Sequence, residues 1–373
     1  MGEMGNIVFS SYHRGSSDHS LACTLVLLLA PSGCSGDELE VVARGRYVEL
    51  ATAHDEPICG GTVSFMDQYV EGVAALLGEP LPDRIFVRYE WIDVEHGVTT
   101  KVGDQRVVRD DMLLRPHELV HAVHREVWPA SRPFMHEGLA VLLDSEGVAP
   151  YSWPEGAALD PMFEADRSED LEYVQAWFFV SQVVRDHGFD GLRELWHAVP
   201  FDATASEIRD AYRDNFGRPI TALFEPEIMY PGEDFEIEVA RHTCYFAVCV
   251  GEQVPWQGDT WSGAAPRDCE DDPVAVGPSP TNFLAPVWRP YVVELGESEH
   301  RFTTSDSVGA FIRPCQLRCS VDDDHSYLGL DGARSTDIGP HVLTGPVRIE
   351  VGRELHDLPA DPPGTLVIER LSP

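Results

Sequence analysis

The sequence predicts an α+β protein built in two parts, with helices in the first part and short strands in the second. Apolar residues recur at helical spacing at several places between residues 62 and 224. Beyond a Pro-Gly break at 231–232, short β-like runs alternate with turns rich in Gly, Pro and Asp. We therefore expect a leader segment at 1–34, a small sheet with a helical bundle at 35–228, and a small all-β domain at 229–373.

An apolar run at 21–30 has the length of a signal-peptide core and is too short to span a bilayer. His13 and Arg14 precede the run, and small residues followed by Cys34 come after it. This arrangement resembles a bacterial lipoprotein signal, although Pro31 replaces the aliphatic residue that is usual three positions before the cysteine. The alternative is a buried core helix, but no amphipathic pattern surrounds the run. We expect export to the cell envelope or beyond it, with a lipid on Cys34 as the membrane tether.

The remaining cysteines favour disulfide bonds, because an even number in an exported chain is typical of a disulfide framework. All but Cys59 lie between residues 244 and 319, so either Cys59 links the two parts of the chain or one thiol stays free. A second zinc site, built from Cys-x4-Cys and Cys-x3-Cys, is the alternative, although neither spacing is the common two-residue knuckle. The six cysteines are Cys59, Cys244, Cys249, Cys269, Cys315 and Cys319.

The chain is strongly acidic, with a formal net charge of −36 and Lys101 as its only lysine. Such a surface repels nucleic acid and anionic lipid, so we exclude DNA and RNA as partners. The acidic run at 322–324 offers a calcium site, with a solvated turn as the alternative reading.

The elements of the first part follow from apolar patterns in chain order. A first strand is expected at 41–51 and an amphipathic helix, closed by a glycine, at 62–77. Alternating apolar residues predict a half-buried strand at 84–92. A hairpin that turns at Gly103-Asp104 is expected at 97–110.

The motif His117-Glu118-x-x-His121 begins an apolar helical run just after Pro116. Positions four apart lie on one face of a helix, so both imidazoles can hold one zinc ion. Glu118 lies one step round the helix and can act as general base for an attacking water. With 15 His in the chain, the pattern arises by chance in roughly one chain in twenty. A third ligand is therefore needed to support a metal site.

Three positions compete for the role of third ligand. His124 lies seven residues after His117, about 10 Å along the helix axis, which is too far for both to bind one ion. A metzincin site would need a His at the position of Val127, so that class is excluded. Glu137 opens a second helical run after a Pro-containing turn, so this helix can fold back and offer a carboxylate to the same ion.

These two helical motifs together resemble the gluzincin branch of zinc metallopeptidases, and most closely its peptidase MA-like domains in exported bacterial proteins. The likeness consists of His117-Glu118-x-x-His121 followed by Glu137-Gly138-Leu139-Ala140, and it covers roughly residues 44–227. It implies a metallopeptidase-like fold for the first part of the chain. By motif position it implies His117, His121 and Glu137 as zinc ligands and Glu118 as the general base.

The same resemblance suggests three further roles. Well-known members of the family carry an Asp that orients a zinc-bound His, and this chain has Val141 at that position. Asp144 is the candidate substitute. The alternative is that Asp144 is a solvated residue at the end of the helix. The strand at 105–109 is the candidate edge strand for pairing with an extended peptide substrate, unless it is an ordinary edge strand. Tyr173 is the candidate for stabilising the tetrahedral intermediate, with a core or surface Tyr as the alternative.

After the second motif helix, the pattern predicts a loop and then a helical bundle. The loop, rich in Gly, Pro and acidic residues, is expected at 145–169. A strongly apolar helix at 171–187 and a short helix at 192–199 follow. A capping box at 204–207 opens another helix, and an apolar run at 220–224 closes the bundle.

The second part of the chain is expected to form a small, disulfide-containing β-domain of the sandwich type. The β-like runs that predict it lie at 235–239, 245–250, 291–295, 310–312, 347–351 and 366–368.

These features predict an exported zinc metallopeptidase that hydrolyses bonds in a peptide or protein substrate. The main alternative is a catalytically inactive, peptidase-like surface lipoprotein that keeps the metal for stability and acts as a binding module. The presence of Glu118 argues against it, because a structural zinc does not need a general base. A second alternative is a structural envelope protein with a coincidental motif, which the helix context of Glu137 argues against. The sequence indicates no oligomeric state.

Overall fold

The computed structural model describes most of the chain from residue 39 onward. The leader with Cys34, the run at 235–239 and the acidic run at 322–324 lie outside the described residues. The described ranges are 39–144, 159–224, 244–278, 287–305, 308–316, 318–319, 328–331, 335–338, 344–353 and 364–371.

A hairpin opens the described chain where the sequence pattern predicted a single strand at 41–51. β1 (Val41–Arg44) and β2 (Val48–Thr52) pair in antiparallel fashion. The turn between them is held by the carboxylate of Asp67, which accepts hydrogen bonds from three consecutive backbone N–H groups at 46–48. The prediction of one strand was wrong because the side chain that stabilises the turn comes from a helix about twenty residues later.

The first sheet has five strands in the order β1-β2-β3-β5-β4. β3 (Val87–Trp91) is parallel to both β2 and β5 (Gln105–Asp110), and β4 (Val98–Val102) returns antiparallel to β5. The predicted hairpin at 97–110 is therefore confirmed. The prediction that its second strand is the edge was wrong, because β5 lies between β3 and β4 and its central valines are buried. The edge strand on this side of the sheet is β4, whose first and last residues, both valines, are exposed.

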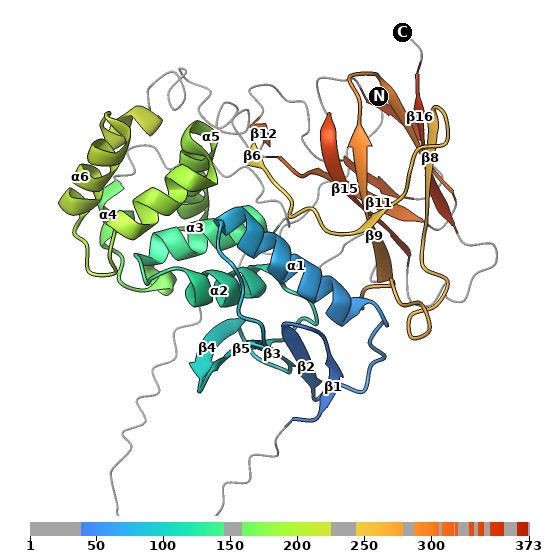
Figure 1. Cartoon of the computed structure of the whole chain (residues 1–373), viewed down its shortest axis with the longest axis horizontal. Coiled ribbons are helices and arrows are strands. Elements are labelled where there is room, and N and C mark those ends of the chain that lie inside the picture. Colours follow the sequence, from blue (N-terminus) through green and yellow to red (C-terminus); the bar gives the residue numbers. More distant parts are fainter. Residues whose placement is uncertain are drawn as a thin grey trace, which may run out of the picture. The chain divides into compact units, whose positions relative to one another are not determined.

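Two helices, α2 (Pro116–Val127) and α3 (Pro133–Leu143), carry the sequence motifs, and α1 (Thr62–Leu77) and α2 pack against this sheet. α1 has the predicted bounds and ends at Gly78 in the left-handed conformation. α2 and α3 each begin with a proline, where the missing N–H costs nothing. α1 and α2 contact each other and the sheet (Figure 1), while α3 packs against α2 and the later helix α5.

The bundle after these helices differs from the prediction in one place. A short helix, α4 (Leu159–Glu164), lies inside the predicted loop at 145–169, because Met162 and Phe163 are buried in the core. The two helices that were expected at 171–187 and 192–199 are confirmed, and they form the two halves of α5 (Tyr173–Ala198), which is kinked between them. Its backbone leaves the helical conformation only at Gly188, with φ 70° and ψ 179°, where the first of them was expected to end.

The capping box that opens α6 (Ala205–Phe216) is confirmed. The Thr204 hydroxyl accepts from the backbone N–H of Glu207, and the Glu207 carboxylate accepts from the backbone N–H of Thr204. A short 3-10 helix, η2 (Ile220–Phe224), follows α6.

The second part of the chain forms two further sheets whose apolar side chains share one core. Trp261 from one sheet packs edge-on against Tyr291 from the other, with ring centroids 5.3 Å apart, as in a β-sandwich. One sheet has the order β14 (Ser335–Ile338), β10 (His300–Thr304), β16 (Thr365–Arg370), β8 (Thr260–Ala264). The other has the order β13 (Leu328–Asp331), β11 (Gly309–Pro314), β15 (Gly345–Arg353), β9 (Val287–Leu295), β7 (Glu252–Gln253). A separate pair joins β6 (Cys244–Tyr245) and β12 (Arg318–Cys319).

Two disulfide bonds answer the question left open by the cysteine pattern. Cys59 bonds to Cys269 and so links the two parts of the chain, and Cys249 bonds to Cys315. The alternative of a cysteine zinc site is wrong, because one cysteine of each candidate pair is in a disulfide. These bonds indicate an oxidising, exported environment. Within the described ranges, no helix is long and apolar enough to cross a membrane.

Candidate metal centre

Three side chains from α2 and α3 bring their donor atoms together. The Nε2 atoms of His117 and His121 lie 3.1 Å apart. The Oε2 atom of Glu137 lies 3.2 Å from the first and 3.1 Å from the second. His121 and Glu137 are each 3% exposed. Helix geometry accounts for the His pair, and the packing of α3 on α2 brings in Glu137 from a position 16 residues after His121. This buried His/His/Glu group could hold a metal ion.

Each imidazole of this trio has a partner on its other ring nitrogen, as metal-binding histidines usually do. The Nδ1 atom of His121 lies 2.9 Å from Nε2 of His124. The Nδ1 atom of His117 forms an ion pair with Asp144 at 3.6 Å. Asp144 thus occupies the place predicted for the residue that orients a ligand His.

A chain of histidines continues from His121 into the core. His124 lies 3.3 Å from His136 between their Nδ1 atoms, and Nε2 of His136 lies 2.9 Å from the carbonyl oxygen of Ser131. Burial lowers the pKa of both His124 and His136, the latter to about 3, so both rings are neutral. The backbone N–H of Ser131 also lies within hydrogen-bond distance of Nε2 of His136, at 3.1 Å, so this nitrogen can either accept from that N–H or donate to the carbonyl. If it carries the proton and donates to the carbonyl, and each of the other two rings donates to the next, the lone pair of His121 Nε2 faces Glu137. That is the tautomer that a metal ligand needs.

This row of histidines was not predicted from the sequence, in which His124 was a candidate only for the third ligand and His136 had no predicted role. A usable signal existed. His124 is three residues after His121 on the same helix face, and His136 directly precedes Glu137.

Replacing His124 by Phe is expected to weaken metal binding about 10- to 100-fold, because the ring volume is kept while the partner of His121 Nδ1 is lost. The affinity is measured by competition with a chromophoric chelator. The control is His197→Phe, at an exposed position near the end of α5. Equal affinities for the wild type and the His124 variant would show that the histidine chain does not position the ligand.

Glu118 lies beside the trio and is held by the edge strand β4. The hydroxyl of Thr99 donates to Oε2 of Glu118 at 2.7 Å. Gly97 lies close to the same carboxylate. A Cβ atom added at this position would lie only 3.0 Å from Oε1 of Glu118 and 2.4 Å from Oδ2 of Asp110, so a side chain there would clash. The site therefore requires both the hydroxyl of Thr99 and the lack of a side chain at Gly97.

Asp110 is a second buried carboxyl group next to Glu118, with 0% exposure. Its Oδ1 accepts from the backbone N–H of Met112 at 2.9 Å, and Nε of Arg115 lies 3.3 Å from its Oδ2. Burial outweighs these partners and raises the pKa of Asp110 to about 7. Sequence reasoning did not select this residue, because its burial depends on the pairing of β3 with β5.

Asp110→Asn is expected to change the pH dependence of stability in the metal-free protein. The folded state holds the Asp110 proton more tightly than the unfolded chain does. Protonated Asp110 therefore adds to the free energy of unfolding below about pH 4, and this added stability is lost as the pH rises through about 7. The wild type therefore loses this stability between pH 5 and pH 8, whereas the variant has no carboxyl group there to titrate. The free energy of unfolding of the variant minus that of the wild type should increase by about 2 to 3 kcal/mol over this range. Urea unfolding at both pH values measures it, with the exposed Asp202→Asn as control. A pH-independent difference would contradict the shift.

Tyr173 begins α5 and also lies at the site, where it is 40% exposed. Its ring centroid is 6.2 Å from that of His117, and its hydroxyl lies near the carboxylate of Glu137. Burial and the neighbouring carboxylates raise the pKa of Tyr173, so its hydroxyl stays a proton donor. Ser168, which sequence reasoning missed, donates to Oε1 of Glu137 at 2.6 Å. Every residue that the motifs predicted for the site is therefore within or beside it.

A comparison of the sequence with models of known protein families finds no match, and a comparison with curated proteins also finds none.

Proposed function

We propose that the protein is an exported zinc peptidase of the gluzincin type, tethered to a membrane by a lipid on Cys34. The observation that carries the proposal is the buried triangle of donors from His117, His121 and Glu137, with sides of 3.1–3.2 Å. Two neighbours of these ligands support the proposal: Glu118 follows His117 on α2 and is the candidate base, and Tyr173 lies near Glu137 and is the candidate hydrogen-bond donor.

The donor set favours zinc over the hard cations. Two imidazole nitrogens and one carboxylate suit zinc, whereas Ca²⁺ and Mg²⁺ prefer oxygen ligands. Tetrahedral zinc with bonds of 2.0–2.1 Å places its ligand atoms about 3.3 Å apart, close to the sides of the triangle. Three protein ligands are typical of catalytic sites, whereas structural zinc sites usually have four.

When bound, zinc would polarise the scissile carbonyl and activate water. The residues around it have separate tasks. Glu118 takes a proton from the attacking water and passes it to the leaving amine, while Thr99 keeps its carboxylate in place. Tyr173 donates a hydrogen bond to the developing oxyanion, for which its raised pKa keeps it protonated. Asp144 and His124 orient the two imidazoles.

The test is the metal content of the purified protein beside a His121→Ala variant, with cleavage of a mixed peptide library followed in parallel. We expect about one zinc per chain in the wild type, and loss of both zinc and cleavage in the variant. Absence of zinc from the folded wild type would overturn the proposal. Zinc without cleavage of any peptide would favour the binding-module alternative.

The lipid tether is tested separately by expressing full-length Cys34→Ser and measuring how the protein divides between membrane and soluble fractions. A wild-type protein that is already in the soluble fraction would contradict the tether while leaving the peptidase proposal intact.

A further inference from the structure

A pocket of about 500 Å³ lies beside the candidate metal centre. His136 and Ser168 are part of its lining, and Ser168 also bonds to the metal-site carboxylate of Glu137. Arg125 lines the pocket too, and it follows His121 by four residues on the same face of α2. The pocket is thus about one helical turn, or roughly 6 Å along the axis, from a metal ligand.

The charge of this lining is opposite to that of the whole protein. Three arginines, Arg106, Arg125 and Arg167, face a single acidic residue, Asp166, in a chain with a net charge of −36. Arg106, Arg167 and Asp166 each form an ion pair with a residue that does not line the pocket. Arg125 is the exception, since no described carboxylate lies within 4.0 Å of its guanidinium.

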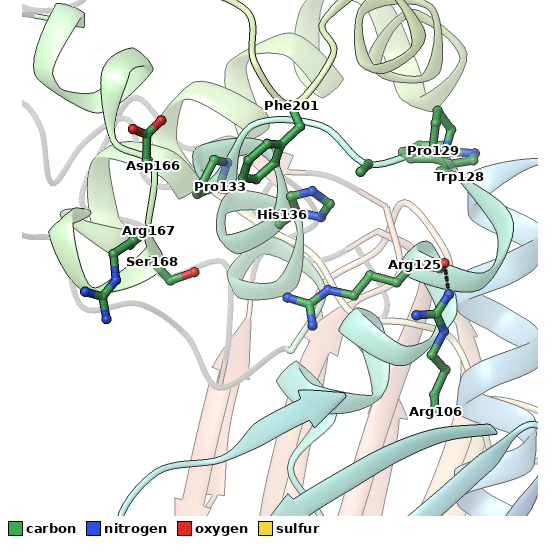
Figure 2. Close-up of a pocket in the computed structure, with 11 residues that line it drawn as sticks. Arg106, Arg125, Trp128, Pro129, Pro133, His136, Asp166, Arg167, Ser168 and Phe201 are labelled. Atoms are coloured by element: carbon green, nitrogen blue, oxygen red, sulfur yellow. Dashed lines mark hydrogen bonds between the residues drawn. The ribbon is translucent and has the colours of Figure 1, made fainter. Parts of the chain in front are cut away.

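Arg125 is positioned to bind a ligand in the pocket. One of its terminal nitrogens donates to the backbone carbonyl of Thr99 at 2.7 Å. A guanidinium has five N–H donors, so others remain for a ligand. Figure 2 shows the Arg125 side chain extending beneath His136 toward Ser168, while the Arg167 side chain points away from Arg125. Because Arg125 is partly buried, its positive charge is only weakly screened by water.

We propose that this pocket binds a carboxylate of the substrate and that Arg125 is the residue that recognises it. The planar guanidinium matches a carboxylate with two parallel hydrogen bonds. Elsewhere the acidic surface repels such a group, so a local cation is required to hold it. An extended peptide advances about 3.3–3.6 Å per residue, so the bound group lies within about two residues of the bond that is cut. This inference rests on the proposed peptidase function, because the carboxylate is placed relative to the scissile bond.

The carboxylate has two sources, an acidic side chain or the C-terminus of a short peptide, and three matched peptides separate them. The first has an internal Glu and an amidated end, the second has Gln at that position and an amidated end, and the third has Gln and a free C-terminal carboxylate. We expect kcat/KM for either the first or the third peptide to exceed that for the second by about 10- to 100-fold. Preference for the first assigns the pocket to an acidic side chain, and preference for the third assigns it to a chain end.

Arg125→Gln should reduce this preference to near unity, and Arg125→Lys should restore part of it. The matched control is Arg213→Gln on α6, which makes the same charge change at an exposed position outside the pocket. Because Arg125 also holds Thr99, thermal melts of each variant accompany the kinetics, and the Lys variant keeps the charge if the Gln variant unfolds. Equal cleavage of all three peptides by the wild type, or a preference that survives in folded Arg125→Gln, would overturn the proposal.

A binding measurement separates failure of this inference from failure of the peptidase proposal. The same peptides are titrated into chelator-treated wild-type protein by calorimetry, where no cleavage occurs. Tighter binding of a carboxylate-bearing peptide, lost in Arg125→Gln, would support the pocket even if no peptide is ever cut. Cleavage without any effect of Arg125 on binding would leave a peptidase but remove the carboxylate pocket.

Discussion

Glu118→Gln is expected to lower kcat for peptide cleavage by about 10² to 10⁴ while leaving the metal content of the protein unchanged. That range is the usual contribution of a general base. The amide has nearly the same shape as the carboxylate and cannot accept the proton from the attacking water. Cleavage by the variant and the wild type is compared on one peptide, with metal measured on the same samples.

The metal should remain because Glu118 is not one of the three donors that form the triangle. Its carboxylate is held instead by Thr99, whose hydroxyl can donate equally well to the amide oxygen of Gln. The control is Glu71→Gln, an exposed residue of α1 that pairs with an exposed arginine. Cleavage at the wild-type rate in Glu118→Gln, with zinc still bound, would remove the proposed base. Loss of zinc would show instead that Glu118 helps to form the site.

Local periodicity was enough to predict the elements that carry the site. The bounds of α1, the start of α2 and the capping box of α6 each depend on residues within a few positions of one another. His117 and His121 converge because they are four apart on one helix. Glu137 could be predicted as their partner because it lies near the start of the next helix, α3. The mixed α+β character and the presence of disulfides followed from composition and spacing.

What the sequence could not predict depends on contacts between distant segments. The parallel pairing of β3 with β5 makes β4 the edge strand and buries Asp110. The contact of Ser168 with Glu137 crosses from a short 3-10 turn to α3. The pairing of Cys59 with Cys269 spans 210 residues. None of these contacts leaves a periodic signal, since each depends on how separate elements pack.

Zinc affinity is expected to rise about 100-fold between pH 6 and pH 8, because binding must displace a proton from the metal-free site. Burial alone would lower the pKa of His117, but hydrogen bonds and ion pairs with Asp144 and Glu137 raise it to about 10. Burial lowers the pKa of His121. Burial acts to raise the pKa of Glu137, but the two histidines hold it below its usual range. His117 is therefore the one ligand that carries an extra proton at neutral pH.

Calorimetric zinc titrations in two buffers of different ionisation heat count the protons released. About one proton per zinc is expected at pH 7, since that pH lies well below the pKa of His117. Asp144→Asn removes one of the two carboxylates that retain this proton. In that variant the pKa of His117 falls, fewer protons are released at pH 8, and the affinity levels off at a lower pH. Release of no proton by the wild type at pH 7, with an affinity that is flat from pH 6 to pH 8, would mean that His117 is already neutral. The ion pair with Asp144 would then only orient the ring and would not make zinc compete with a proton.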